Sequence, residues 1–253
     1  PEFSTTRAEL AQKSVDAILD FGEKGFPGIL VETIAIFINN LAAPANTKVF
    51  SLTHRLHLTQ PQAYIFDPEL PYWIIYRNQL FDSVCRKLDF DVFEVFRDRQ
   101  LTNKFLSSSG ELRVLKSRNL SDDGKEILDI PGYDSYISYA AAKPLSVFQY
   151  LDAPNVYLTP NMTYKPRMMK KPPHCVVNGS LAILIPKGGI VPTEKQLAYF
   201  SSEEYRAFYQ IARNFQTRSL NVDACSVFFY GLLRDEAKPA PEKFDTSVQL
   251  SFL

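Results

Sequence analysis

Basic side chains occur in three separate stretches of this sequence, and each stretch also contains Asn, Thr, Tyr or Gln. Residues 97–118 hold six Lys and Arg against two acids, 161–171 hold four, and 205–221 hold three, the last two stretches without an acid. Lys and Arg neutralise phosphates, whereas Arg, Asn and Gln can hydrogen-bond the edges of bases. The pattern therefore indicates contact with a nucleic acid, but it is also typical of charged side chains spread over a solvated surface.

Candidate contact residues follow from the side-chain types in these stretches. Guanidinium groups suit guanine edges or phosphates, and Asn side chains suit adenine. The candidates are Arg97, Arg99, Arg118, Arg167 and Arg218 in the first class, and Asn103, Asn119, Asn161 and Asn214 in the second. Further cations expected at the same surface are Lys116, Lys165, Lys170, Lys171 and Arg213. Tyr164 and Met168 are candidates for wedging between bases, and for every residue a surface ion pair or a loop cap is the alternative.

Two other functions stay open. Asp223 precedes Glu236 and Lys238 across an apolar segment, and metal-dependent nucleases use such a set to hold Mg²⁺ and poise a water molecule. Glu-x-Lys arises often by chance, and here it leads into a Pro-rich tail. Alternatively, the aromatic helix expected over 201–215 docks a partner protein. Signatures of dinucleotide loops, P-loops, zinc proteases and serine hydrolases are missing from the sequence, and its scattered Cys and His residues predict no metal site.

The elements that must position these side chains alternate between helix and strand. Apolar spacing predicts helices over 6–21 and 72–88, and capping boxes at Thr193 and Ser201 predict two later helices. Runs of β-branched and aromatic residues predict a buried strand over 28–39, and further strands over 47–52, 63–66, 112–115, 155–158, 181–185 and 226–233. We therefore expect a mixed α/β fold.

Length and charge set further bounds. With 253 residues, of which 45% are hydrophobic, the chain can bury a core without disulfides or metals, and no segment is apolar for long enough to predict a membrane span. The net charge is zero, but residues 1–95 hold 8 Lys+Arg and 12 Asp+Glu whereas the remainder holds 20 and 16. An acidic part therefore precedes a basic part. Three widely spaced Cys residues favour a reducing, cytoplasmic location, and the start at Pro1 without Met predicts a longer parent protein.

Several segments, taken in order, resemble one known family. They are FPGILVETIAIFI, LPYWIIYRNQLFDSVCRKLDFDVFEVFRDRQLTNKF, ELRVLKSRNL, DIPGYDSYI, YLTPNMTYKPR and VVNGSLAILIPK. Together they resemble the C-terminal part of restriction–modification DNA methyltransferases, in particular the N6-adenine branch associated with type IIS systems. The resemblance extends over nearly the whole chain.

The resemblance implies a division into three parts. Residues 1–89 would be the C-terminal remnant of a catalytic methyltransferase domain with its connector helix, and residues 90–235 a target-recognition domain similar to those of type I specificity subunits. Residues 236–253 would be a charged, Pro-rich tail. Within the recognition domain, Lys116, Arg118 and Asn119 would face double-stranded DNA. The implied partners are this DNA and the upstream methyltransferase domain of the same chain.

The resemblance also implies a cofactor outside these residues. Such methyltransferases bind S-adenosylmethionine through a glycine-bearing loop and hold the flipped adenine in an Asn/Asp/Ser-Pro-Pro-aromatic loop. Neither loop occurs in the 253 residues. We therefore expect this chain to have no catalytic residues, cofactor or metal of its own, and S-adenosylmethionine to serve the parent enzyme in the bacterial cytoplasm, at the nucleoid.

Overall fold

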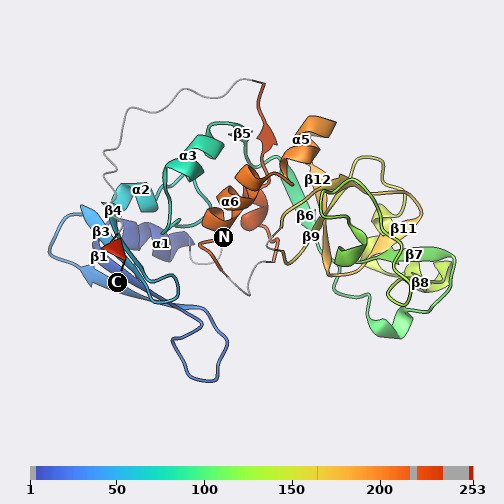
Figure 1. Ribbon diagram of the computed structural model, residues 1–253, viewed down its shortest axis with the longest axis horizontal. Helices are drawn as coiled ribbons and strands as arrows, with labels where there is room; N and C mark the ends of the chain where they lie inside the picture. Colours follow the sequence, from blue (N-terminus) through green and yellow to red (C-terminus); the bar gives the residue numbers. More distant parts are fainter. Residues whose placement is uncertain (1–3, 164, 217–220, 236–250, 253) are drawn as a thin grey trace. The chain divides into compact units, whose positions relative to one another are not determined.

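The computed structural model describes residues 4–163, 165–216, 221–235 and 251–252, which form two separate units (Figure 1). Described residues of the first unit lie in 4–82, 211–216 and 251–252, and those of the second in 83–163, 165–210 and 221–235. Both units mix helices with small sheets, so the mixed α/β class is confirmed. The units differ from the domains expected from sequence, because residues 211–216 return to the first unit.

The first unit is built on a five-stranded sheet with the order β14-β4-β3-β1-β2. β1 runs parallel to β3, and every other neighbouring pair is antiparallel. The strands are β1 Ser14–Gly22, β2 Thr33–Asn39, β3 Asn46–Ser51, β4 Leu56–Pro61 and β14 Ser251–Phe252. The strand expected over 47–52 is thus confirmed as β3.

β1 replaces most of the helix that was expected over 6–21, of which only α1 Ser4–Ala11 is helical. Val15 and Ile18, three residues apart, are both completely buried. That spacing imitates a helix because the pairing of β1 with β2 shifts register between Val15 and Ala17, which resets the alternation of a strand. The helix prediction failed at this bulge.

β2 forms the edge of the sheet and contradicts the prediction of a buried strand over 28–39. Ile34 and Phe37 on the strand are 50% and 54% exposed, and Ile29 and Leu30 in the loop before it are also exposed. Figure 1 shows this loop in blue, extending beyond the sheet. Because β1 alone pairs with β2 among the described strands, the apolar side chains of this segment gain little burial.

Short helices accompany the sheet. The segment expected as a strand over 63–66 is the helix α2 Gln62–Ile65, and the helix expected over 72–88 is confined to α3 Gln79–Cys85. Asn78 causes the late start of α3, because its Oδ1 accepts a hydrogen bond from the backbone N–H of Phe81 at 3.0 Å. Gln62 fixes α2 to β1: its Oε1 accepts from the N–H of Val15 at 2.7 Å, and its Nε2 donates to the carbonyl of Lys13.

The second unit contains two main sheets. One has the order β10-β9-β12-β6 with antiparallel neighbours, and the other places β7 between the parallel β11 and the antiparallel β8 (Figure 1). The strands are β6 Phe93–Phe96, β7 Leu112–Leu115, β8 Ser135–Ile137, β9 Tyr157–Pro160, β10 Met169–Lys170, β11 Cys175–Val177 and β12 Leu181–Pro186, and a separate pair joins β5 Leu88–Asp89 to β13 Leu232–Leu233. The strands expected over 112–115 and 181–185 are confirmed, and that over 155–158 lies two residues later.

The core of the second unit lies between these sheets. Val114 of β7, Leu158 of β9 and Ile183 of β12 are completely buried in one apolar cluster. Leu112, Val114 and Leu115 of β7 are buried in this cluster, whereas Arg113 is only partly buried and the polar residues 116–119 follow the end of the strand. The functional candidates depend on this geometry.

Helical segments complete the second unit. They are the α-helices α4 Tyr139–Ala142, α5 Glu194–Tyr199 and α6 Glu203–Ala212, of which the last two residues belong to the first unit, and the 3₁₀ turns η1 Asn103–Phe105, η2 Ser117–Asn119, η3 Ser146–Tyr150, η4 Lys187–Gly189 and η5 Ser226–Phe229. The capping box at Thr193 is confirmed. α6 instead has Ser202 as its cap, because the Oγ of Ser202 accepts from the N–H of Tyr205, whereas the Oγ of Ser201 donates to the carbonyl of Asp123. The strand expected over 226–233 is confined to β13 Leu232–Leu233, since η5 takes its first half.

Candidate functional site

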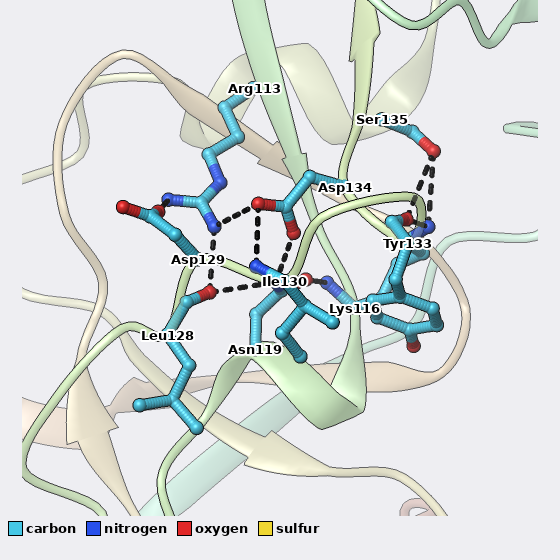
Figure 2. A network of polar contacts seen from close by, with 9 residues as sticks. All are labelled: Arg113, Lys116, Asn119, Leu128, Asp129, Ile130, Tyr133, Asp134 and Ser135. Atoms are coloured by element: carbon cyan, nitrogen blue, oxygen red, sulfur yellow. Dashed lines mark hydrogen bonds and ion pairs between the residues drawn. The ribbon is translucent and has the colours of Figure 1, made fainter.

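The end of β7 carries two cations around one aromatic ring. Lys116 follows the strand directly, and its Nζ lies 3.9 Å from the ring centroid of Tyr133. The same Nζ donates to the carbonyl of Tyr133 and to the Oγ of Ser135, the latter at 3.0 Å (Figure 2). The guanidinium carbon of Arg118, one residue beyond Ser117 in the turn η2, lies 4.6 Å from the same centroid. Arg118 is exposed, so a cation is presented to solvent on an ordered support.

Asn119 holds the turn η2 in place from inside the protein. Its side chain is completely buried, its Oδ1 accepts from the N–H of Lys116 at 2.9 Å, and its Nδ2 donates to the carbonyl of Leu128 and to Asp134 (Figure 2). The expectation that Asn119 faces DNA is therefore wrong. The first of these hydrogen bonds closes the turn η2 on itself, and the two from Nδ2 connect η2 with the loop 128–135.

Asp134 is the centre of this network. Its Oδ1 accepts from Asn119 at 2.7 Å, and its Oδ2 accepts from Arg113 and from the N–H of Ile130, both at 3.0 Å. Desolvation opposes the charged carboxylate, but these hydrogen bonds and the Arg113 charge hold the pKa of Asp134 below its ordinary value. Arg113 also pairs with Asp129 at 2.6 Å, so both carboxylates are engaged by one guanidinium (Figure 2).

Arg167 brings the second cationic stretch to the same place. Its Nη2 donates to the carbonyls of Ser117 and Leu120 at 3.2 Å, and its Nη1 donates to the carbonyl of Lys165 at 3.1 Å. Burial lowers the pKa of Arg167, whose side chain braces two loops and is 8% exposed. Lys165 itself is exposed and lies 3.4 Å from Asp122. Arg167 is thus a brace and not a surface contact.

Other expected contacts are buried as well. Asn161, 7% exposed, donates to the carbonyl of Gly179 and to Asn221. Lys171, 4% exposed, donates to the carbonyls of Leu151 and Pro172, and its burial lowers its pKa. Met168 is 1% exposed and packs in the interior, so it cannot wedge between bases. Because these three side chains are buried, the expectation that they contact DNA is wrong.

The third stretch is divided, and part of it belongs to the first unit. Arg213 is 4% exposed and donates to the hydroxyl of Tyr72. Asn214 has a φ of +49° and holds the segment before α3, because its Nδ2 donates to the carbonyl of Trp73 and its Oδ1 accepts from the N–H of Ile75, both at 2.9 Å. Both side chains thus serve to hold the backbone of the first unit.

The remaining candidates are distributed differently. Arg99, Asn103 and Lys170 are exposed, and Arg97 donates to the Oδ1 of Asn161 at 3.3 Å. Tyr164 and Arg218 lie outside the described residues. Among the candidates, Lys116 and Arg118 share the Tyr133 ring, and Arg167 links the backbone at Lys165 to η2.

The nuclease and metal alternatives find no support in the described part of the chain. Asp223 orders the turn before η5, since its Oδ1 accepts from the N–H groups of Cys225 at 3.0 Å and Ser226 at 2.8 Å, while Glu236 and Lys238 lie outside the described residues. Within those residues, no group of three or more His, Cys, Asp or Glu side chains is arranged to hold a metal ion. No described helix is long and apolar enough to cross a membrane.

Sequence reasoning missed Tyr133 and Asp134, although both lie in the segment DIPGYDSYI that carries part of the family resemblance. The Tyr133 ring lies at least fifteen residues along the sequence from its partners Lys116 and Arg118. The Asp134 carboxylate lies fifteen residues from its partner Asn119. No periodicity connects them, so the only available signal was a Gly132 turn that presents two polar residues before a strand, and Gly132 indeed has a φ of +75°.

Gly22 and Gly25, near the N-terminus, lie against side chains of the protein itself, whereas a Cβ at Gly28 would meet nothing within 4 Å. A Cβ at Gly22 would clash with the Oγ1 of Thr53, and one at Gly25 with the Oγ1 of Thr33, so these glycines admit side chains of the protein itself. A comparison of this chain with protein-family models and with curated proteins finds no match.

Proposed function

We propose that this chain binds double-stranded DNA as the target-recognition part of a site-specific adenine-N6 methyltransferase of a restriction–modification system. The observation that carries the proposal is the end of β7, where Arg167 ties two of the three cationic stretches together and leaves Arg118 and Lys165 exposed. Cations from separate segments on one rigid support suit a polyphosphate better than isolated surface charges do.

The division between buried and exposed cations supports the same proposal. Arg167, Lys171 and Arg113 donate to backbone carbonyls or acids inside the protein, which orders the loops at a cost in desolvation. The exposed Arg118 then needs no reorganisation to meet a ligand. Pre-ordered cations lose less entropy on binding than flexible ones.

The methyltransferase assignment rests on the resemblance of the sequence segments alone. S-adenosylmethionine would supply the methyl group to the parent enzyme. The residues of this chain would bind and orient the duplex, and we expect the chain alone to bind DNA without methylating it.

Selection of bound sites from a random duplex library by the purified chain tests the proposal. We expect enrichment of a defined sequence, with affinity that falls by about a hundredfold between about 50 and 200 mM salt if roughly four phosphates are contacted. Absence of duplex binding at the lower salt concentration contradicts the proposal. Methyl transfer to DNA by the chain alone would refute the expectation that it is catalytically inactive.

A further inference from the structure

Two like charges are held together at the end of β7. The Nζ of Lys116 and the guanidinium carbon of Arg118 lie 3.9 and 4.6 Å from the centroid of the Tyr133 ring. The face of the ring attracts both, because its π electrons carry partial negative charge. Desolvation lowers the pKa of Lys116 and the charge of Arg118 lowers it further, whereas the charge of Asp134 raises it. The two cations therefore repel each other, and an anion bound directly by both would relieve that repulsion.

The nearby acids are already used. Both oxygens of Asp134 accept hydrogen bonds from Asn119, Arg113 or the N–H of Ile130, and Asp129 pairs with Arg113. Lys116 donates to neutral oxygens, those of the Tyr133 carbonyl and the Ser135 hydroxyl. Within the part of the chain that the structure describes, no carboxylate lies within ion-pair distance of Arg118.

We propose that Arg118, Lys116 and Tyr133 form a binding site for one phosphodiester group of the DNA backbone. Arg118 donates to the phosphate oxygens, Tyr133 supports the guanidinium, and Lys116 adds a second positive charge. The inference rests on the proposed function and sharpens it, because it assigns Arg118 to a phosphate and not to a guanine edge. It also adds Tyr133 as the residue that supports the guanidinium of Arg118.

The phosphate assignment follows from charge. A guanine edge offers two neutral acceptors, which one guanidinium satisfies. A phosphodiester carries a full negative charge and relieves the repulsion between two cations. A guanidinium held over a ring retains its N–H donors for a bidentate pair with phosphate oxygens.

Asp134 is a positioning residue for this site. It touches neither cation through an ion pair, but it holds Asn119 and the N–H of Ile130 at the two ends of the connection between η2 and the loop 128–135. Tyr133 precedes it directly in that loop. The hydrogen bonds of Asp134 therefore hold the loop that carries the Tyr133 ring, and the ring in turn holds Lys116 and Arg118.

The test compares the wild-type chain with Arg118→Ala, Tyr133→Leu and a control, Lys195→Ala, which removes an exposed cation on α5. Each protein is measured against the enriched duplex and against an unrelated duplex over a range of salt concentrations. We expect Arg118→Ala to weaken binding to both duplexes about tenfold and to make the slope of log affinity against log salt shallower by about one. Tyr133→Leu should weaken both a few-fold, and Lys195→Ala should bind as the wild type.

The outcomes separate the inference from the function it rests on. If the wild type binds no duplex at low salt, the proposed function fails. If the wild type binds but Arg118→Ala binds equally well, only the phosphate site is refuted. If Arg118→Ala changes the preferred sequence while the salt slope stays unchanged, Arg118 reads a base and the inference is wrong. Urea unfolding of each variant confirms that it is folded.

Discussion

Two arginines of this protein make almost the same contact with a tyrosine, one in each unit. The guanidinium carbon of Arg77 lies 4.5 Å from the ring centroid of Tyr64 in the first unit, and that of Arg118 lies 4.6 Å from Tyr133 in the second. Arg77 also pairs with Asp67 at 2.7 Å and with Asp82 at 2.8 Å. Arg118 has a second cation beside it instead.

The difference shows how one residue type serves structure in one place and binding in another. The Arg77 side chain is 15% exposed, and the hydroxyl of Tyr64 donates to Asp82, so every partner of the cluster is engaged. An anionic ligand would therefore gain no new ion pair with Arg77. Arg118 is exposed on a comparable ring with its charge uncompensated by a described carboxylate, so only there does a ligand gain an ion pair.

The largest effect is expected from Arg77→Ala. Removal of the guanidinium leaves the carboxylates of Asp67 and Asp82 without their cation in a partly buried site, which should lower the free energy of unfolding by about 3 kcal/mol. Trp73, the single tryptophan, stacks on Phe66 in the same unit, so its fluorescence during urea unfolding measures the loss. A loss below about 1 kcal/mol would show that this cluster is no more structural than Arg118.

An intermediate effect is expected from Asp134→Asn in the network under Tyr133. At pH 7 the variant should lose about 1–2 kcal/mol, since charged hydrogen bonds to Asn119, Arg113 and Ile130 become neutral. The folded-state pKa of Asp134 is depressed, so its contribution is present above its ordinary value and is lost as the pH falls. The gap between variant and wild type should therefore narrow below about pH 4.

Asp129→Asn is the matched control for that measurement. Asp129 pairs with the same guanidinium of Arg113 but is 86% exposed, and it should change stability by less than about 0.5 kcal/mol. Far-ultraviolet circular dichroism during urea unfolding at several pH values measures both variants. Equal losses from the two acids would contradict the view that Asp134 supports the loop from below.

The smallest effect on stability is expected from Arg118→Ala. An exposed cation–π contact contributes less than about 1 kcal/mol, so the midpoint of urea unfolding should hardly move. The contrast with Arg77→Ala sharpens the comparison, because the same substitution at matched ring contacts should separate stability from DNA affinity. If Arg118→Ala unfolds as early as Arg77→Ala, then Arg118 is structural too.

Two strands of the second unit were predicted well from their apolar residues. The runs at 112–115 and 181–185 became β7 and β12, because their side chains fill the core of the second unit. The Thr193 capping box was also correct, since both of its hydrogen bonds are local. Local interactions need no knowledge of distant partners, and these two runs lie where the core of the second unit buries them, unlike the apolar run over 28–39.

Predictions failed where a distant residue decides the outcome. The bulge in β1 depends on its pairing with β2, and the exposure of β2 depends on its position at the edge of the sheet. In the candidate site, Asn119 and Arg167 have the same composition signal as Arg118, yet their partners bury them. Burial of a polar side chain follows from its hydrogen-bond partners, which the spacing of one stretch does not reveal.

The sequence by itself determined a mixed α/β chain with an acidic first part, a basic second part and a strand at 112–115 that leads into cations. Tertiary structure alone decided which cations are buried, as Arg167 is, and which are exposed to solvent, as Arg118 is. It did so because Tyr133 and Asp134 approach the end of β7 only after β8 pairs with β7, and this pairing sets the neighbours of each charge.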